Sequence, residues 1–336
     1  MESGRKVVIV VGVAAGPKVA AKLRRLDPAA EITIIEKGHF LSYAGCGLPY
    51  YISGVVKEQK DLMATPLGVL RDPAFFEKTM NVKVLNHTEA TRIDRQGRRV
   101  EVRSAEGTRW LGYGVLVLAT GAHAVRPRLP GIDLANVFTL HRIEDAEGIK
   151  ALLGKAQRPG GEPPELLGRN AVIIGGGLIG VEMAEALAAD GSRVTLVEML
   201  PQILPMLDWE MATLVQRHME AKGIRVLTGA AAERIEGRDL AEAIVVNGQR
   251  LPADLVVVAV GVRANADLAR EAGVEIGTTG AIKVDATMRT SDPSIYAAGD
   301  CTEDRHLVTG APVFISNGAT SNKKGRVAAI NIAGGH

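Results

Sequence analysis

The sequence of 336 residues is poor in cysteine and nearly neutral overall. Its two cysteines, Cys46 and Cys301, are too few for a disulfide framework, and no cluster of cysteine and histidine has the spacing of a zinc site. Forty basic and 38 acidic residues give a formal net charge of +2, so no overall field attracts nucleic acid or an anionic membrane. We therefore expect no metal, no nucleic acid and no membrane partner, and any anion must be bound by local groups.

Long hydrophobic runs are also missing. No stretch reaches the roughly 18 uninterrupted apolar residues that a membrane-spanning helix needs. Residues 1–16 have the basic and then apolar order of a signal peptide, but the apolar run 7–11 is short, β-branched and followed by a glycine turn. That pattern favours a buried parallel strand. Because disulfides are also not expected, we predict a cytoplasmic protein.

The sequence does contain one unit twice, about 163 residues apart. Each copy, over residues 6–36 and 171–198, has an apolar strand, a glycine turn, a helix and a second strand. The helices are expected at 17–26 and 181–189. This order indicates parallel strands joined by right-handed crossovers, and the length suits about two domains. The sequence therefore predicts an α/β fold with two Rossmann-like nucleotide-binding domains.

The second glycine turn matches the dinucleotide-binding pattern G-x-G-x-x-G at Gly175, Gly177 and Gly180. The three glycines permit the tight turn, the close approach of backbone to a pyrophosphate, and close packing of helix on strand. Glu198 follows 18 residues after Gly180, where a carboxylate accepts hydrogen bonds from an adenosine ribose and repels a 2′-phosphate. We expect NADH rather than NADPH here, with Gly261 closing the module.

The first glycine turn is imperfect, because Val11, Val13 and Gly16 stand at its three glycine positions and Gly12 lies between the valines. Glu36, twenty residues after Gly16, has the ribose-binding placement again. We expect Val11 to weaken the turn, since a β-branched residue is strained at positive φ. The alternative is that this unit has lost its nucleotide.

Two further segments fit a flavin better than a second nicotinamide. Residues 115–121 form a strand that ends in Ala-Thr-Gly, and residues 294–300 form one that ends in Ala-Gly-Asp. With these motifs, the whole chain resembles the FAD-dependent pyridine nucleotide-disulfide oxidoreductases. The resemblance implies a glutathione-reductase-like fold in which Thr120 and Gly121 lie between the nucleotide domains, while Gly299 and Asp300 bring a carboxylate to the ribityl chain of FAD.

The domain boundaries are predicted from the same pattern. Residues 159–164 are rich in proline and glycine and form the clearest linker. We expect a discontinuous FAD-binding domain over residues 1–145 and 270–336, with an NAD(P)H-binding domain over 146–269 inserted in it.

Cys46 lies in a segment, 42–54, that carries one cysteine where disulfide reductases of this family have C-x-x-x-x-C. A dithiol mechanism is therefore excluded. The segment resembles the single-cysteine branch, which includes coenzyme A disulfide reductases, coenzyme A persulfide/polysulfide reductases and NADH oxidases. The resemblance implies that Cys46 cycles beside the flavin between a thiolate and a mixed disulfide, with its pKa lowered by a helix N-terminus or a cation. Cys301 is expected to serve in packing.

A basic stripe on the first helix has two interpretations. Lys18, Lys22 and Arg25 recur at helical spacing where coenzyme A disulfide reductases contact the coenzyme A nucleotide, and Arg25 and Ser42 agree with that pattern. The alternative is a solvated basic face. Peroxidases and some oxidases of the branch place a histidine where Ala14 and Ala15 stand, which argues against peroxide as the main substrate.

The end of the chain carries the last match and the main departures. Residues 310–325 resemble the segment whose backbone and Asn322 approach the isoalloxazine ring, although Ser316-Asn317 stands where Pro-Leu is usual. Relatives continue with a third domain that forms a homodimer, so we expect either a truncated gene product or a more open site. The predicted cofactor-binding residues are Gly12, Ala15, Gly16, Glu36, Lys37, Ser42, Thr120, Gly121, Gly175, Gly177, Gly180, Glu182 (the acid near the nicotinamide), Glu198, Gly261, Gly299, Asp300 and Asn322.

Together these features predict a flavoprotein reductase that passes electrons from NAD(P)H through FAD to Cys46 and on to a coenzyme A disulfide, persulfide or polysulfide. One alternative is an NADH oxidase that reduces oxygen at the flavin. Another is a non-catalytic nucleotide-binding remnant, which the Val11 turn and the absent third domain would suit.

Overall fold

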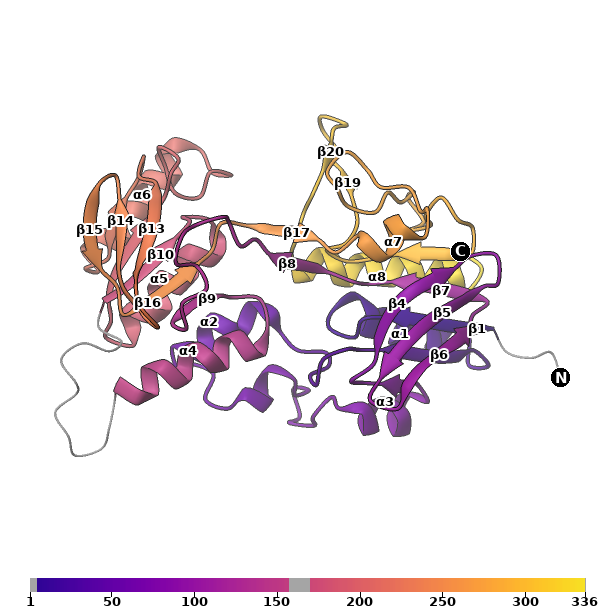
Figure 1. The fold of residues 1–336 in the computed structure, drawn as a ribbon. Coiled ribbons are helices and arrows are strands. Elements are labelled where there is room, and N and C mark those ends of the chain that lie inside the picture. The colour runs from indigo at the N-terminus through magenta and orange to yellow at the C-terminus, as the bar shows by residue number, and fades with distance from the viewer. Residues whose placement is uncertain (1–4, 157–169, 336) are drawn as a thin grey trace. The chain divides into compact units, whose positions relative to one another are not determined.

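The computed structural model describes residues 5–156 and 170–335. The predicted linker at 159–164 lies outside the described residues. The chain divides into two compact units (Figure 1). Unit 1 comprises Met1–Ala44, Lys60–His123 and Arg263–His336, and unit 2 comprises Gly45–Gln59 and Ala124–Val262.

Unit 1 is built on a five-stranded sheet in which all neighbouring strands are parallel. Its strand order is β18 (Ile295–Ala297), β7 (Val115–Leu118), β1 (Lys6–Val10), β2 (Glu31–Ile35) and β3 (Lys83–Leu85). Alternate side chains of β1 enter two different cores. Val7 and Ile9 pack with α1 (Ala15–Leu26) and α8 (Gly318–Ile332), whereas Val8 and Val10 pack with a three-stranded antiparallel sheet.

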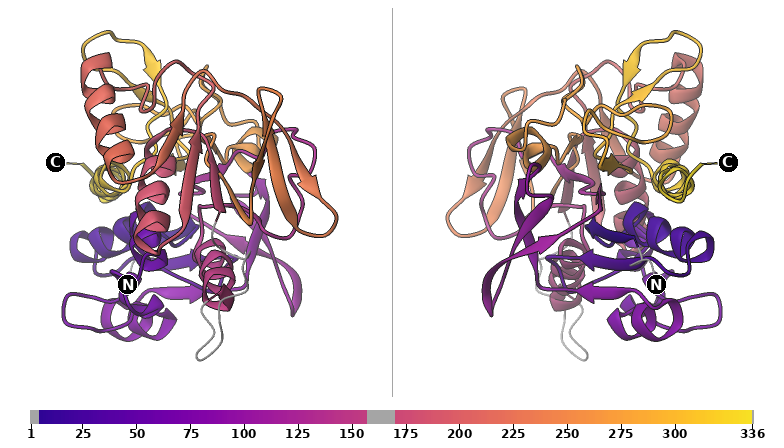
Figure 2. Two further views of the ribbon diagram at one scale, coloured as in Figure 1. Left: turned by 90° about the vertical axis from the view of Figure 1, so that its left-hand side faces the viewer. Right: turned by 90° about the vertical axis from the view of Figure 1, so that its right-hand side faces the viewer.

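The remaining elements of unit 1 are short. The antiparallel sheet consists of β4 (Glu89–Asp94), β5 (Arg99–Ser104) and β6 (Gly107–Gly112), and β8 (Ala122–Ala124) pairs with β17 (Val262–Ala264) where the chain leaves and re-enters the unit. The others are η2 (Gln59–Leu62), α3 (Pro73–Met80), α7 (Asp267–Glu271), β19 (Asp304–Arg305) and β20 (Pro312–Val313). Figure 2 shows these elements from two further directions.

Unit 2 repeats the same plan. Its parallel sheet has the order β12 (Arg225–Leu227), β11 (Arg193–Val197), β10 (Asn170–Ile174), β16 (Leu255–Val258) and β9 (Val137–Thr139). The antiparallel strands β13 (Ala232–Gly237), β14 (Ala241–Val246) and β15 (Gln249–Pro252) pack on it. The unit also holds η1 (Gly45–Gly47), α2 (Leu48–Ile52), α4 (Ile143–Ala156), α5 (Leu178–Ala189) and α6 (Trp209–Ala221). Both sheets place the first strand of their repeat at the centre, which confirms the predicted α/β class.

The limits of the compact units differ from the predicted domain boundaries at 145/146 and 269/270. Residues 124–145 belong to unit 2 because β9 pairs with β16 and because the buried Asn136 side chain donates hydrogen bonds to the carbonyls of Ala241 and Asp254. Residues 45–59 also belong to unit 2, since α2 packs on α4 and α5. The predicted assignment of FAD and NAD(P)H to domains stays a prediction.

The helices begin slightly earlier than predicted. Helix α1 starts at Ala15 instead of Pro17, and α5 starts at Leu178 instead of Val181. Across residues 5–156 and 170–335, no helix combines the length and apolar character that a membrane crossing requires.

Candidate functional site

The glycine turn of unit 1 joins β1 to α1 and is held by Glu36. The Gly12 amide donates a 2.8 Å hydrogen bond to Glu36 Oε2, and the Gly38 amide donates a 2.7 Å bond to Oε1. A Cβ atom at Gly16 would overlap the carbonyl oxygen of Val11, so only glycine fits there. The Glu36 side chain is buried within this turn.

Val11 adopts φ of 80°, the left-handed region in which a β-branched residue is strained. Its amide nevertheless donates a 2.8 Å hydrogen bond to the Ile35 carbonyl, which carries the β1–β2 ladder into the turn. The conformation expected to strain Val11 is therefore present, while the hydrogen bond at the end of the strand is kept.

The glycine turn of unit 2 is held in the same manner by Glu198. The Gly176 amide donates a 2.6 Å bond to Glu198 Oε2, and the Leu200 amide donates a 2.7 Å bond to Oε1. A Cβ atom at Gly180 would overlap the Gly175 carbonyl oxygen. Gly175 itself has φ of 109°. From the sequence we predicted only that Glu198 binds the ribose of a nucleotide. The structure adds that its carboxylate fixes the turn.

The two turns satisfy the local requirements of a nucleotide site. An ionised carboxylate has about four acceptor positions, and the two backbone bonds to Glu36 or Glu198 leave capacity for ribose hydroxyl donors. Within the described residues, no side chain caps the N-terminal amides of α1 or α5. Such amides and the helix dipole favour an anion, as a pyrophosphate requires.

The Gly299-Asp300 turn approaches the start of α1. Gly299 has φ of 98°, and a Cβ atom on it would lie 3.0 Å from the Ala15 Cβ. Ser321 Oγ donates to Asp300 Oδ1, and Ser316 Oγ donates to Oδ2 at 2.7 Å. The structure thus brings the predicted residues Ala15, Gly299 and Asp300 together in unit 1, with two serine hydroxyls that orient the Asp300 carboxylate.

The residues at the unusual Ser316-Asn317 pair have local structural roles. Ser316 binds Asp300, and Asn317 is the N-cap of α8, since its side chain accepts a 2.7 Å bond from the Thr320 amide. Asn322 Nδ2 donates at 2.8 Å to the Gly318 carbonyl one turn earlier in α8. The predicted Asn322 side chain is therefore bonded to its own helix.

The predicted Thr120 is engaged with the backbone of the returning chain. Its hydroxyl donates at 2.6 Å to the Asn265 carbonyl, and Asn265 Nδ2 donates at 2.8 Å to the Thr120 carbonyl. Gly121 and Gly261 both have positive φ, at 67° and 111°. Conformational freedom explains glycine at these two positions.

Cys46 lies in η1, directly before α2, and its side chain belongs to an exposed residue of unit 2. Lys150 of α4 holds α2, because its Nζ donates at 3.0 Å to the Tyr51 carbonyl and lies 4.0 Å from the centre of the Tyr51 ring. Cys301, by contrast, is fully buried, and burial raises the pKa of its thiol. Cys46 is therefore the cysteine that an external reagent can reach.

The predicted coenzyme A residues lie in unit 1. Lys18 and Lys22 are half-buried on α1 and Arg25 is exposed. Ser42 has φ of 49°, and its amide donates at 2.8 Å to the Gly12 carbonyl. Arg71, which sequence reasoning missed, directs Nη1 toward the Ser42 carbonyl at 3.4 Å. No local motif marks Arg71, because its partner is 29 residues away.

Glu182 lies on α5, and partial desolvation together with the nearby charge of Glu185 raises the pKa of its carboxyl group. Lys37, the remaining predicted residue, directly follows Glu36 and is exposed. Within the described part of the chain, no group of three or more histidine, cysteine, aspartate or glutamate side chains is placed to hold a metal ion.

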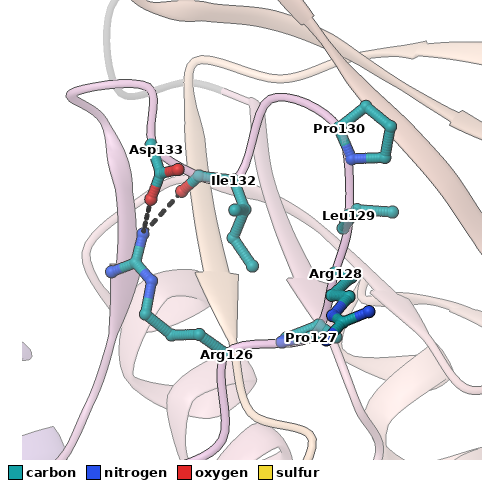
Figure 3. Close-up of a pocket in the computed structure, with 7 residues that line it drawn as sticks. All are labelled: Arg126, Pro127, Arg128, Leu129, Pro130, Ile132 and Asp133. Atoms are coloured by element: carbon teal, nitrogen blue, oxygen red, sulfur yellow. Dashed lines mark hydrogen bonds and ion pairs between the residues drawn. The ribbon is translucent and has the colours of Figure 1, made fainter.

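A shallow depression in unit 2 is lined by residues 126–130, 132 and 133 (Figure 3). Arg126 Nη2 donates at 2.6 Å to the Ile132 carbonyl and lies 3.3 Å from an Asp133 carboxylate oxygen. No residue of the predicted site lines this depression. The guanidinium group of Arg126 is already bonded to other residues of the same loop.

Comparisons with known proteins decide the family. The family model for pyridine nucleotide-disulphide oxidoreductases matches residues 5–324. The chain belongs to that family. FAD and NAD(P)H are the cofactors of this family. The resemblance seen in the sequence is thereby confirmed, together with the cofactors that it implied.

Three similar proteins show which activities occur among its relatives. The chain is 35% identical to a Methanocaldococcus jannaschii protein named NADH oxidase and 35% identical to a Pyrococcus horikoshii NAD(P)H coenzyme A polysulfide/persulfide reductase; each alignment covers 98% of this chain and 70% of the relative. The solved structure of an NAD-dependent persulfide reductase from A. fulgidus is 44% identical, with a TM-score of 0.94. That match covers 98% of this chain and 60% of the other, so this chain spans less than two thirds of that protein.

Proposed function

We propose that this chain is an NAD(P)H-dependent flavoprotein reductase that reduces a coenzyme A disulfide, persulfide or polysulfide at Cys46. The observation that carries this proposal is a single exposed cysteine, placed at the start of α2, in a chain whose second cysteine is fully buried. Relatives named for coenzyme A-dependent sulfur chemistry support the same choice.

The cofactor assignment follows from the two turns. In unit 1, Gly12 and Gly16 allow the backbone to approach a pyrophosphate, Glu36 accepts the ribose hydroxyls, and Asp300 accepts from the ribityl chain of FAD. In unit 2, the turn from Gly175 to Gly180 and Glu198 hold the nicotinamide nucleotide. Because the Glu198 carboxylate would repel a 2′-phosphate, we propose NADH over NADPH.

The basic groups of unit 1 suit a coenzyme A moiety, which carries several phosphate charges. Lys18, Lys22 and Arg25 follow one stripe of α1, and Arg71 adds a guanidinium group beside Ser42. Arginine and lysine bind phosphate through charge-assisted hydrogen bonds. These residues of unit 1 therefore suit the nucleotide end of the substrate.

The chemistry at Cys46 is thiol–disulfide exchange. Its thiolate attacks one sulfur of a coenzyme A disulfide, breaks the S–S bond and expels one coenzyme A thiolate, which leaves a mixed disulfide on Cys46. Bound FAD supplies the means to take a hydride from NAD(P)H and pass on the electron pair. With FAD bound, that pair would cleave the mixed disulfide, release the second coenzyme A thiolate and restore the Cys46 thiolate. Overall, one disulfide, one NAD(P)H and one proton give two coenzyme A thiols and NAD(P)⁺.

The test compares Cys46→Ser with the matched cysteine variant Cys301→Ala in protein supplied with FAD. NADH consumption is followed with coenzyme A disulfide, with polysulfide and with oxygen. We expect Cys46→Ser to lose the disulfide-dependent rate by at least about a thousandfold, as the loss of a catalytic nucleophile does. Cys301→Ala should keep that rate. Unchanged disulfide reduction by Cys46→Ser would refute the proposed role of this residue.

A second candidate function is an NADH oxidase, which the Methanocaldococcus jannaschii relative favours. In that case oxygen is the acceptor, and Cys46→Ser lowers oxygen consumption less than disulfide reduction. The visible absorption of bound flavin distinguishes both enzymes from a non-catalytic remnant. Protein that binds no FAD after refolding with excess flavin would be such a remnant.

A further inference from the structure

A buried lysine lies beside the Gly299-Asp300 turn and has no part in the proposed function. Lys324 of α8 is 5% exposed. Its Nζ donates to three acceptors: the Gly299 carbonyl at 3.3 Å, Thr302 Oγ1 at 2.9 Å and Asp304 Oδ2 at 2.7 Å. An ammonium group has three N–H donors, so all of them are used. Every acceptor lies within residues 299–304, the segment that contains Asp300.

The helix that carries Lys324 is itself fixed against the first glycine turn. A Cβ atom at Gly325 would lie 2.8 Å from the Ala15 carbonyl oxygen and 3.2 Å from the Lys18 Cβ, so α8 and α1 are in close contact. The same helix provides Ser321, whose hydroxyl donates to Asp300 Oδ1. Lys324 therefore connects the segment after Asp300 to α8. The contact of Gly325 with α1 sets the distance of α8 from the predicted pyrophosphate turn.

Thr302 completes the network. Its fully buried hydroxyl donates at 2.9 Å to the Gly299 carbonyl while it accepts from Lys324. The Gly299 carbonyl thus has two donors, one from Thr302 and one from Lys324. Since Gly299 is held at φ of 98°, these bonds fix the peptide that sets the direction of the Asp300 side chain.

We propose that Lys324 is a positioning residue for Asp300: it fixes the Gly299 carbonyl and thereby aims the Asp300 carboxylate at the flavin. The inference rests on the proposed function, in which Asp300 accepts a hydrogen bond from the ribityl chain. Lys324 does not itself touch the cofactor. The competing interpretation is that the Lys324–Asp304 ion pair serves only the stability of the fold.

A double variant separates these two interpretations. Lys324→Met leaves the half-buried Asp304 carboxylate without its cation, and Asp304→Asn leaves the buried Lys324 cation without its carboxylate, so each single variant should be less stable. In Lys324→Met/Asp304→Asn no charge is left unpaired, and stability should return close to wild type. The contacts of Lys324 to Gly299 and Thr302 are nevertheless absent from the double variant.

The readouts are the thermal midpoint of the flavin-free protein and the FAD dissociation constant, measured by flavin fluorescence. We expect the double variant to recover most of the lost midpoint but to bind FAD about ten- to a hundredfold more weakly than wild type, as the loss of a hydrogen bond from a charged group implies. Lys323→Met, at the exposed neighbouring position, should change neither quantity. If Lys324→Met does not fold, the double variant alone provides the comparison.

Recovery of FAD affinity together with stability in the double variant would overturn the positioning role. The experiment also includes Asp300→Ala, which keeps failure of this inference distinct from failure of the proposed function. If wild type binds FAD and Asp300→Ala weakens binding while the double variant does not, only the inference about Lys324 fails. If Asp300→Ala binds FAD as tightly as wild type, the proposed flavin site itself fails.

Discussion

The glycine turns of the two units have nearly the same backbone but different side chains. Val11 and Gly175 both donate 2.8 Å hydrogen bonds to the preceding ladder, at Ile35 and Val197. The amides of Ser42 and Leu204 likewise donate to Gly12 and Gly176, and both residues have φ close to 50°. The shared parts are a buried glutamate, the glycine whose amide donates to it (Gly12 or Gly176), and the last glycine of each turn. The turn is therefore specified by these three residues more than by its first glycine.

We expect the largest loss of stability from a substitution at the last glycine of either turn. Gly16→Ala and Gly180→Ala each place a methyl group onto a backbone carbonyl oxygen, at Val11 and Gly175. Because the carbonyl is not the end of a flexible side chain, we expect a loss of about 3 kcal/mol or more in the free energy of unfolding, measured by urea titration. Gly154→Ala, in α4 with open space around it, is the control and should raise stability by about 0.5–1 kcal/mol. Similar stability of all three variants would contradict the steric argument.

Valine is tolerated at the first position of one turn only. A Cβ atom at Gly175 would overlap the carbonyl of Ala259, the residue that follows the neighbouring strand β16, whereas Val11 is accommodated. We expect Gly175→Val to cost about 2–3 kcal/mol and to weaken NADH binding, from the added clash and the strain of a branched residue at φ of 109°. Calorimetric titration with NADH measures the second effect, and unchanged NADH affinity in a folded variant would refute it.

Glu198 should set the preference between nicotinamide nucleotides in a way that Glu36 does not. In Glu198→Gln the amide keeps one oxygen acceptor but loses the charge that repels a 2′-phosphate, so the ratio of NADPH to NADH affinity should rise about tenfold. Glu36→Gln is the matched control in the other turn and should leave the ratio unchanged. Equal ratios in both variants and in wild type would show that Glu198 does not discriminate.

The smallest effect is expected where strain is removed. Val11→Gly relieves the cost of a branched residue at φ of 80°, about 1–2 kcal/mol. The added freedom of glycine in the unfolded chain offsets about 0.4–1 kcal/mol of that gain. We expect a net rise in stability of about 0.5–1 kcal/mol and FAD affinity at least as high as in wild type. A clear loss of stability would mean that the valine side chain packs favourably enough to outweigh its strain.

The features that the sequence predicted are those determined by neighbours along the chain. The turns and the parallel strands follow from local spacing and β-branched residues, and both are found in the structure. Glu36 and Glu198 lie where the spacing placed them, and their binding of ribose stays a prediction. The starts of α1 and α5 were predicted three residues late or less, because Ala14 and Gly177 give no side-chain capping signal.

The features that could not be predicted depend on contacts between distant segments. Arg71 meets Ser42 across 29 residues, and Lys324 meets Asp304 across 20. No sequence pattern predicts the packing of α2 on α4 and α5, which places Cys46 in unit 2. Such contacts arise from the tertiary fold, so spacing and periodicity contain no signal for them.

The central claim is that Cys46 carries the substrate covalently, and the most direct test is a mass measurement. Protein with Cys46 as the free thiol and with bound FAD in its oxidised form is incubated with coenzyme A disulfide, quenched in acid and digested, and the cysteine peptides are analysed. The expected result is a coenzyme A adduct on the peptide that contains Cys46, removed by NADH in the presence of FAD. An unmodified Cys46, or an adduct that NADH and FAD leave in place, would contradict the claim.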